Sequence, residues 1–244
     1  MEKFIKKLKN LYISTVVVAA GKGSRMNLDI SKQYIEIYGI PVLARALSVF
    51  EECGLIDEIV LVVNENDIVF CKQNIVDFFG FDKVKALVAG GSERQHSVYN
   101  GLLQVNKNAD IVIIHDGARP FIKEKHLIEC IQAADKFGAS GVGVRVKDTV
   151  KRVNDKGMVV RTVDRTNLWA IQTPQVFKYG LIIEAHKKAL QDGFLATDDV
   201  MLVERLDKEV KMVEGSYDNI KITTQEDLAV AEAIAAKFDG AGQD

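Results

Sequence analysis

The segment TVVVAAGKGSRM, residues 15–26, constrains the fold more than any other part of this chain. Its β-branched apolar run predicts a buried strand of a parallel sheet, and the turn that follows would then lie at the ligand-binding edge of that sheet. Gly21 and Gly23 allow a ligand to approach the backbone closely, while Arg25 and Lys32 add positive charge. The segment therefore predicts a cradle for a polyphosphate, and the alternative is an ordinary turn with surface cations.

Two better-known phosphate-binding loops do not match this segment. The P-loop needs four residues between its first glycine and Gly-Lys-Ser/Thr, whereas Lys-Gly-Ser follows Gly21 at once. The dinucleotide fingerprint needs a small third residue, where this chain has Met26, and a helix that opens immediately, whereas residues 27–40 look irregular. A dinucleotide-dependent oxidoreductase, the alternative enzyme class, is therefore disfavoured.

Composition limits the possible functions. The chain has 244 residues and a formal net charge of −2, so no global basic field points to nucleic acid. Its three cysteines are scattered, which disfavours a zinc site or a disulfide framework and fits a reducing compartment. Because no stretch has the length of a membrane span or the pattern of a signal peptide, we expect a cytoplasmic protein without nucleic-acid or membrane partners.

Strands and helices alternate over the first part of the chain. Strands are expected at residues 57–64, 83–89 and 111–116, and helices at residues 41–53, 67–79 and 123–137. This order predicts an α/β fold, with a mostly parallel, twisted sheet covered by helices on both faces. We expect a single domain over residues 1–244.

Two further segments place polar residues at expected strand ends. Ser92 and Gln95 predict a capping box at the start of a helix, and the alternative is a capped helix with no other role. Asp116 ends an apolar run, so its carboxylate is a candidate for holding Mg²⁺ or a sugar hydroxyl. Arg119 is expected either to bind an anion or to form a structural pair with Asp116.

The alternation breaks at about residue 146. Alternating segments at 148–153 and 158–163 flank an Asn-Asp-Lys-Gly turn and predict a β-hairpin, within an arm of approximately residues 146–166. A two-stranded ribbon is marginal by itself, so we expect it to pack on a second copy of the chain. The alternative for its cation-rich side is a solvated face.

The last third of the chain returns to strands and helices. Residues 197–199 predict an N-cap followed by first-turn acids. Residues 218–223 predict a strand in which Lys221 points away from its isoleucine neighbours, into either solvent or a cleft. A final helix is expected to run to about residue 238, with a frayed end at residues 240–244.

Taken together, these motifs make the chain resemble the 2-C-methyl-D-erythritol 4-phosphate cytidylyltransferase family. The resemblance rests on nine segments in order: AAGKGSRM (19–26), SKQY (31–34), GGSERQHSV (90–98), HDGARP (115–120), VKDTVKRV (146–153), VDRTNLW (163–169), QTPQVF (172–177), TDD (197–199) and NIKIT (219–223). Each segment is weak evidence alone, but the ordered set is specific and spans nearly the whole chain.

The resemblance implies a Rossmann-like nucleotidyltransferase fold, a homodimer joined by the β-arm, and Mg²⁺-dependent joining of CTP to methylerythritol phosphate. It implies catalytic roles for Arg25, Lys32, Asp116 and Lys221, with Asp116 also near the metal. It implies nucleotide binding by Ala19, Ala20, Gly21, Gly23, Gly91, Ser92, Ser97, Asp116 and Gly117. It implies substrate binding by Arg119, Thr149, Arg165, Thr173, Thr197 and Lys221, of which Thr149 and Arg165 would serve the neighbouring subunit.

Departures and rivals complete the sequence-based picture. Many members have Pro at Ser31, Ala at Gly117 and an acid at Ser92. The closest rival is the ribitol-5-phosphate cytidylyltransferase family, but VKDTVKRV and VDRTNLW are more similar to the methylerythritol enzymes. A nucleotide-binding regulator without activity is a third hypothesis, which the intact set of charged residues disfavours.

Overall fold

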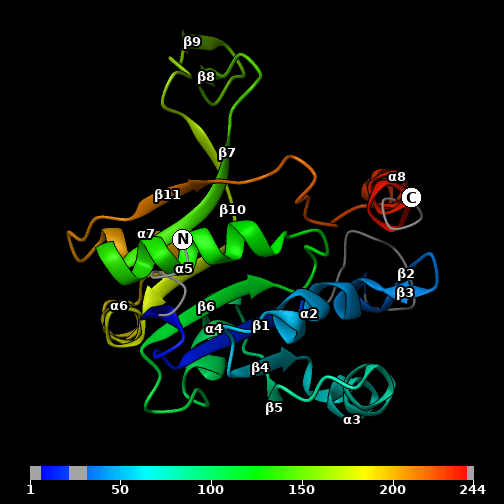
Figure 1. Ribbon diagram of the computed structural model, residues 1–244. Coiled ribbons are helices and arrows are strands. Elements are labelled where there is room, and N and C mark those ends of the chain that lie inside the picture. Colours follow the sequence, from blue (N-terminus) through cyan, green and yellow to red (C-terminus); the bar gives the residue numbers. More distant parts are fainter. Residues whose placement is uncertain (1–6, 22–31, 241–244) are drawn as a thin grey trace.

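A seven-stranded sheet forms the centre of the computed structural model, which describes residues 7–21 and 32–240 (Figure 1). In spatial order, its strands are β11 (Lys211–Glu214), β7 (Ala139–Arg145), β10 (Trp169–Lys178), β6 (Ile111–Asp116), β1 (Ile13–Ala19), β4 (Glu58–Val63) and β5 (Val84–Ala89). Only β10 among these runs antiparallel to its neighbours. The predicted mostly parallel sheet is therefore confirmed.

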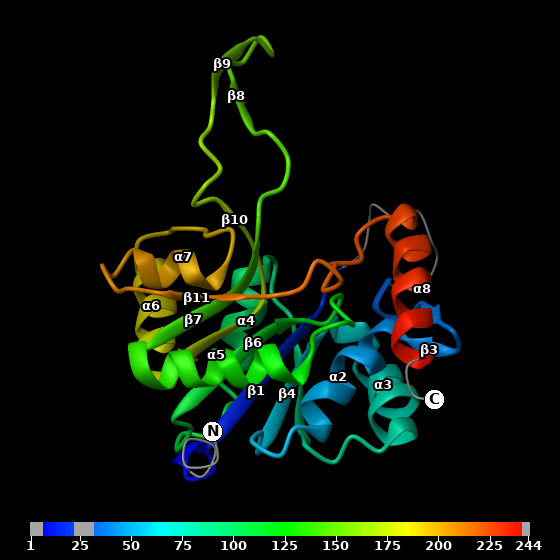
Figure 2. The ribbon, with the colours of Figure 1, turned by 45° about the horizontal axis from the view of Figure 1, so that its top comes forward.

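Helices cover both faces of this sheet because the central strands are apolar on both sides (Figure 2). One face packs against α2 (Val42–Glu52), α3 (Ile68–Cys71) with the π-helical turn η3 (Lys72–Asp77), and α5 (Glu124–Phe137). The other face packs against α4 (Arg94–Leu102), α6 (Tyr179–Gln191) and α7 (Asp199–Glu204). Side chains of the central strands pack into a hydrophobic cluster on each face of the sheet, and this packing holds the carboxyl ends of the strands in place.

A smaller cluster joins the last helix to the segment that follows the first loop. It contains α8 (Gln225–Gly240), the short strands β2 (Glu36–Ile37) and β3 (Ile40–Pro41), and buried side chains such as Ile222 and Phe121. Two 3₁₀ turns, η1 (Lys32–Tyr34) and η2 (Glu65–Asp67), precede β2 and α3. This cluster ties residues 219–223 to the body of the molecule beside the carboxyl edge of the sheet.

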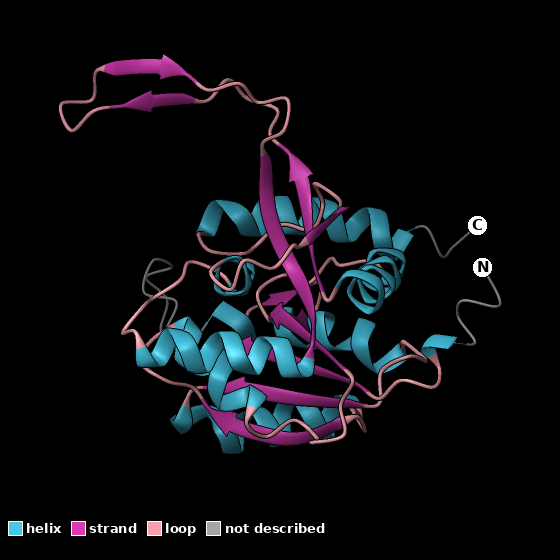
Figure 3. Ribbon diagram, turned by 90° about the vertical axis from the view of Figure 1, so that its left-hand side faces the viewer, coloured by secondary structure: helices cyan, strands magenta, loops and turns pink. Residues whose placement is uncertain are grey.

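A hairpin projects far from the sheet, as Figure 3 shows. Its strands β8 (Lys151–Val153) and β9 (Val159–Thr162) pair only with each other in the described structure. The amide of Asn154 donates to the carbonyl of Met158, and Gly157 takes a φ of 75°, which closes the predicted turn. The hairpin is confirmed, with strands shorter than the predicted 148–153 and 158–163.

The structure corrects one expected strand. Residues 218–223 form no strand, and the amide of Ile222 donates to Ala118 O in a loop instead of to a ladder partner. The expected side-chain alternation is nevertheless present, since Ile222 is buried while Lys221 points to the site. The expected fraying of 240–244 falls, from residue 241, outside the described residues.

Within the described ranges, no helix has both the length and the apolar character that crossing a bilayer requires. Cys53, Cys71 and Cys130 are buried free thiols, as the scattered pattern predicted. Burial raises the pKa of Cys71 and Cys130 to about 12, so both thiols stay protonated and unreactive near neutral pH.

Candidate active site

Four strand ends meet at one edge of the sheet. β6, β1, β4 and β5 are adjacent and parallel, with Val18 opposite Asp116, Ala19 opposite Val63, and Val63 opposite Ala89. The loops that leave these strands therefore gather at the carboxyl edge, where open α/β sheets bind ligands. The end of β1, from which the first loop leaves, and the strand ending in Asp116 are therefore neighbours.

A cavity of about 760 Å³ opens among these loops. It is lined by Val18, Ala19, Ala20, Gly21, Gln33, Asn64, Glu65, Asn66, Gly90, Gly91, Ser92, Glu93, Arg94, Ser97, Asp116 and Ala118. Its size is within the range of small-molecule sites. The cavity suits a ligand as large as a nucleotide.

Gly90 is required where two of the loops touch. A Cβ at this position would lie 2.3 Å from the Cβ of Ala20 and 3.0 Å from Ser97 Oγ. The next amide, of Gly91, donates to Ser97 Oγ at 3.0 Å, and that hydroxyl donates to Glu93 O at 3.1 Å. Gly90 thus brings the loop after β5 close to Ala20, and the hydrogen bonds join that loop to the first turn of α4.

The predicted capping box at this helix is wrong. The N-cap residue of α4 is Glu93, and no side chain caps the helix. Ser92 Oγ instead lies 2.9 Å from His96 Nδ1, while Gln95 turns away to bond with Phe194 O and the amide of Ala196. The helix is anchored by tertiary contacts of its first turn, which a local motif does not reveal.

Asp116 carries two ion pairs at the wall of the cavity. Arg94 Nε lies 2.9 Å from Oδ1, and Lys221 Nζ lies 2.7 Å from Oδ2. Burial alone would raise the pKa of the Asp116 carboxyl, but the charges of Arg94 and Lys221 outweigh it and hold that pKa far below its usual range. Asp116 is therefore held as a carboxylate near neutral pH.

Arg119 does not form the structural pair with Asp116 that the sequence allowed. Its Nη1 donates to Asn219 O at 2.8 Å, and its buried Nε has no hydrogen-bond partner among the residues that the structure describes. Burial lowers the pKa of Arg119, while Asp116 opposes that change from nearby. Its remaining donors are consistent with the other expectation, an anion site.

A second, smaller cavity of about 100 Å³ shares Arg94 and Asp116 with the first. Its lining is completed by Arg119, Ile171, Gln172, Thr173, Gln175, Thr197 and Asp198. Two recesses thus meet at one carboxylate, and the smaller of them is rich in hydroxyl, amide and guanidinium groups.

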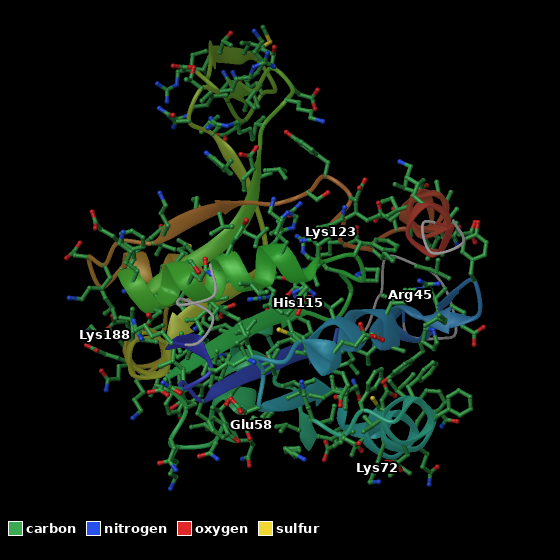
Figure 4. All side chains as sticks on the ribbon, viewed as in Figure 1. Arg45, Glu58, Lys72, His115, Lys123 and Lys188 are labelled. Carbon is green, nitrogen blue, oxygen red and sulfur yellow. The ribbon has the colours of Figure 1, made fainter. Side chains whose placement is uncertain are left out.

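His115, labelled in Figure 4, precedes Asp116 in β6 and is fully buried. The amide of Asp116 donates to Thr173 Oγ1 at 3.0 Å, and the same Oγ1 lies 3.1 Å from His115 Nδ1. His115 Nε2 lies 3.0 Å from Arg119 O, and burial lowers the pKa of the imidazole to about 4. Neutral His115 therefore fixes the strand end from which Asp116, Gly117 and Arg119 project.

The structure brings together most of the residues singled out from the sequence. Around the two cavities lie Ala19, Ala20, Gly21, Gly91, Ser92, Ser97, Asp116, Gly117, Arg119, Thr173, Thr197 and Lys221. Gly23 and Arg25 lie outside the described residues, and Lys32 is described only as part of the η1 backbone. The roles assigned to all these residues stay predictions.

Thr149 and Arg165 stand apart from this group. Both are exposed at the base of the hairpin, where Arg165 donates to Lys147 O, and neither lines the two cavities as the described chain forms them. A single chain therefore does not bring the hairpin base to Asp116.

The sequence analysis did not single out three residues of this region as functional: Arg94, Asp199 and His186. Arg94 Nη1 lies 2.7 Å from Asp199 Oδ2, and Asp199 Oδ1 lies 3.2 Å from His186 Nε2. Asp199 was expected only as a first-turn acid, and the cap of α7 is the Asp198 side chain, which accepts from the Met201 amide. No spacing in the sequence links position 94 with 199, so only the fold reveals this cluster.

Comparison with known proteins gives the family. The family model of 2-C-methyl-D-erythritol 4-phosphate cytidylyltransferase matches residues 13–237. The chain belongs to this cytidylyltransferase family. Curated members from Caldanaerobacter subterraneus subsp. tengcongensis and Geobacillus kaustophilus are 49% and 52% identical to it. These matches cover 92% and 91% of this chain, and 99% and 96% of the relatives.

Solved structures agree with the cytidylyltransferase assignment. A 4-diphosphocytidyl-2C-methyl-D-erythritol synthase from Anaerococcus prevotii has a TM-score of 0.84 and 36% identity, covering 94% of this chain and 98% of that one. The Francisella tularensis 2-C-methyl-D-erythritol 4-phosphate cytidylyltransferase has a TM-score of 0.77 and 30% identity, covering 91% and 99%. The predicted family, fold and enzyme class are confirmed, and the ribitol-phosphate alternative is not favoured.

Proposed function

We infer that this chain is the enzyme that joins CTP to 2-C-methyl-D-erythritol 4-phosphate, giving 4-diphosphocytidyl-2-C-methyl-D-erythritol and pyrophosphate. The family match over residues 13–237 carries this conclusion. The chemistry of the two cavities supports it, because a nucleotide-sized recess and a smaller polar recess meet at Asp116.

The proposed mechanism is an in-line displacement. A phosphate oxygen of methylerythritol phosphate attacks the α-phosphorus of CTP, and the bond from that phosphorus to the departing pyrophosphate oxygen breaks. Both reactants are anions, so positioning and charge neutralisation provide most of the catalysis. We assign CTP to the large cavity, and the alcohol phosphate to the small one beside Arg119 and Thr173. Arg25 and Lys32 would neutralise the triphosphate.

Mg²⁺ is the proposed cofactor, and the donor set fits a nucleotide-bound ion. No group of three or more His, Cys, Asp or Glu side chains forms a metal cage among the described residues. Mg²⁺ usually takes one or two carboxylates together with substrate phosphates, which one carboxylate at the junction of the cavities satisfies. Asp116 would hold the ion with the triphosphate. When bound, Mg²⁺ would neutralise charge on the triphosphate and on the leaving pyrophosphate.

A homodimer is proposed from the hairpin. Val153, Met158, Val159 and Val160 are each more than half exposed on it, which is unusual for so many neighbouring apolar side chains. Packing against a second copy would cover them and would bring Thr149 and Arg165 toward the partner's small cavity. The three free thiols also support the proposed cytoplasmic location, because a reducing compartment keeps thiols unpaired.

The deciding experiment measures pyrophosphate release with CTP and Mg²⁺ and compares methylerythritol 4-phosphate with ribitol 5-phosphate. Release with the first acceptor alone is expected. Release with the second alone would overturn the acceptor assignment. An Asp116→Asn variant should bind CTP but lose turnover, and full turnover in that variant would contradict the assigned role of Asp116.

A further inference from the structure

Arg94 stands in the wall shared by the two cavities, and it is held there by two carboxylates. Its Nε donates to Asp116 at 2.9 Å, and its Nη1 donates to Asp199 at 2.7 Å. A guanidinium that spans two carboxylates is fixed in both position and plane, as a lysine ammonium would not be. The first carboxylate belongs to the proposed reaction centre, and the second lies behind it.

Asp199 is held firmly within the protein. Its side chain is 1% exposed, and both of its carboxylate oxygens are used, one by Arg94 and the other by His186 Nε2. Its backbone amide donates to Gln175 Oε1 at 3.0 Å, and Gln175 in turn donates to Asp198. The ring of His186 stacks on Tyr99, with 5.8 Å between the centroids. The contacts come from α6, α7, β10 and α4, so the carboxylate cannot shift without disturbing several elements.

A buried carboxylate destabilises the fold unless it is paired. Here the partner of Asp199 is Arg94, which lines both cavities. We propose that Asp199 is a positioning residue of the reaction: it fixes Arg94 in the wall between the two cavities and takes up part of its charge, so that Arg94 orients Asp116 without fully neutralising it. The inference rests on the proposed role of Asp116.

The charge of Asp199 lets the proposal be told apart from a simple loss of structure, because it affects turnover and CTP affinity differently. Near the wall, Arg94, Lys221 and Arg119 carry positive charge, while Asp116 and Asp199 carry negative charge. Removing the charge of Asp199 leaves the cavity wall more positive, which favours a polyanion such as CTP. The same change frees Arg94 to move, and Asp116 then loses its fixed orientation. Turnover should therefore fall while the affinity for free CTP does not.

The test compares Asp199→Asn with the unaltered enzyme in two measurements. Steady-state pyrophosphate release should fall about ten- to a hundredfold in kcat, since misplacing a reacting group has costs of that order. The Kd of CTP, measured by calorimetry with the metal chelated, should be unchanged or lower. The matched control is Asp192→Asn, because Asp192 also pairs with two cations but lies at the surface away from both cavities. It should leave both quantities unchanged.

A double-variant comparison tests whether Asp199 acts through Arg94. Arg94→Lys keeps the charge but cannot bridge both carboxylates, so it should lose a similar factor in kcat, and adding Asp199→Asn should cost little more. If Asp199→Asn does not fold, Arg94→Lys alone tests the proposal, and full turnover of the Arg94→Lys variant would overturn it. Unchanged kcat in folded Asp199→Asn, or a Kd for CTP that worsens in step with kcat, would likewise overturn it. Activity in Asp116→Asn would instead refute the role of Asp116 on which the inference rests.

Discussion

At the scale of single residues, the site is a balance of charge around one carboxylate. Asp116 is kept ionised although it is buried, because cations from two distant parts of the chain contact its two oxygens. The sequence correctly placed Asp116 at the end of an apolar run, and it correctly pointed Lys221 away from its isoleucine neighbours, although the strand expected around Lys221 does not form. It gave no sign of Arg94 because a charged residue in the first turn of a helix is ordinary on a surface.

Lys221→Met tests the balance directly. We expect kcat to fall by about 10² to 10³, or about 3–4 kcal/mol of transition-state stabilisation, as when a donor to a developing charge is removed. Thermal stability should change little, since Asp116 keeps its pair with Arg94. Lys188→Met is the control, because Lys188 pairs with Asp192 at the periphery (Figure 4). Normal turnover in Lys221→Met would remove Lys221 from the mechanism.

His115 links the site to stability at acid pH. Its pKa is about 4 in the folded protein against 6.5 for the free side chain, because burial disfavours the charged ring. Between these values the unfolded chain binds more protons than the folded one, so stability falls as the pH drops through this window. Going from pH 8 to pH 5, we expect this single group to remove about 2 kcal/mol from the free energy of unfolding.

Urea unfolding of His115→Gln at a series of pH values checks this expectation. The variant should be less stable than the unaltered protein at pH 8, because the contact with Thr173 is altered. Its stability should then decline less between pH 6.5 and pH 5. Parallel curves for the two proteins would show that His115 does not contribute to the acid dependence.

At the scale of elements, the hydrophobic pattern correctly predicted the strands and the hairpin. It failed where an element is set by tertiary contacts instead of by its local sequence. The strands β1, β4 and β6 and the hairpin followed from their apolar runs and turn residues. The segment 219–223 alternates apolar and polar residues as a strand does, but the amide of Ile222 bonds to a single loop carbonyl instead of to a neighbouring strand. A period-two pattern therefore cannot separate such a segment from a strand. The start of α4 was misread because Glu93 takes the N-cap position without a side-chain cap.

Gly90→Ala tests the contact between the loops that follow β1 and β5. A methyl group would lie 2.3 Å from Ala20 Cβ, so the two loops must separate. We expect the Kd of CTP to rise about tenfold or more, and stability to fall by about 1–3 kcal/mol. Gly54→Ala is the matched control because its added methyl would meet nothing within 4 Å. Equal behaviour of the two variants would mean that the close approach has no role.

At the scale of the whole molecule, the described chain leaves its proposed site incomplete. The cavities hold Asp116 and Arg119, but Thr149 and Arg165 sit at the foot of a hairpin that leads away from the body. The sequence predicted the hairpin because its turn and alternation are local. It could not predict the partner contact in the same way, because exposed apolar residues such as Val159 do not specify which surface covers them.

An exchange of subunits tests whether one site uses two chains. Asp116→Asn and Arg165→Ala should each be nearly inactive as pure proteins. In a symmetric dimer that shares its sites, mixing them one to one and allowing exchange makes half of the dimers hybrid, each with one intact site. About a quarter of the unaltered activity should then return. No recovery, with exchange shown by differently tagged chains, would mean that each site lies within one chain.

The hairpin tip separates assembly from chemistry in the same experiment. Val159→Asp adds a charge to an exposed apolar side chain that touches neither cavity, so folding of the body should be preserved. If the tip packs on a second copy, this variant should be shifted toward monomer in sedimentation and should lose turnover while still binding CTP in the large cavity. A monomer with full turnover would contradict the shared site even though the dimer existed. A dimer of normal stability would instead move the interface elsewhere on the chain.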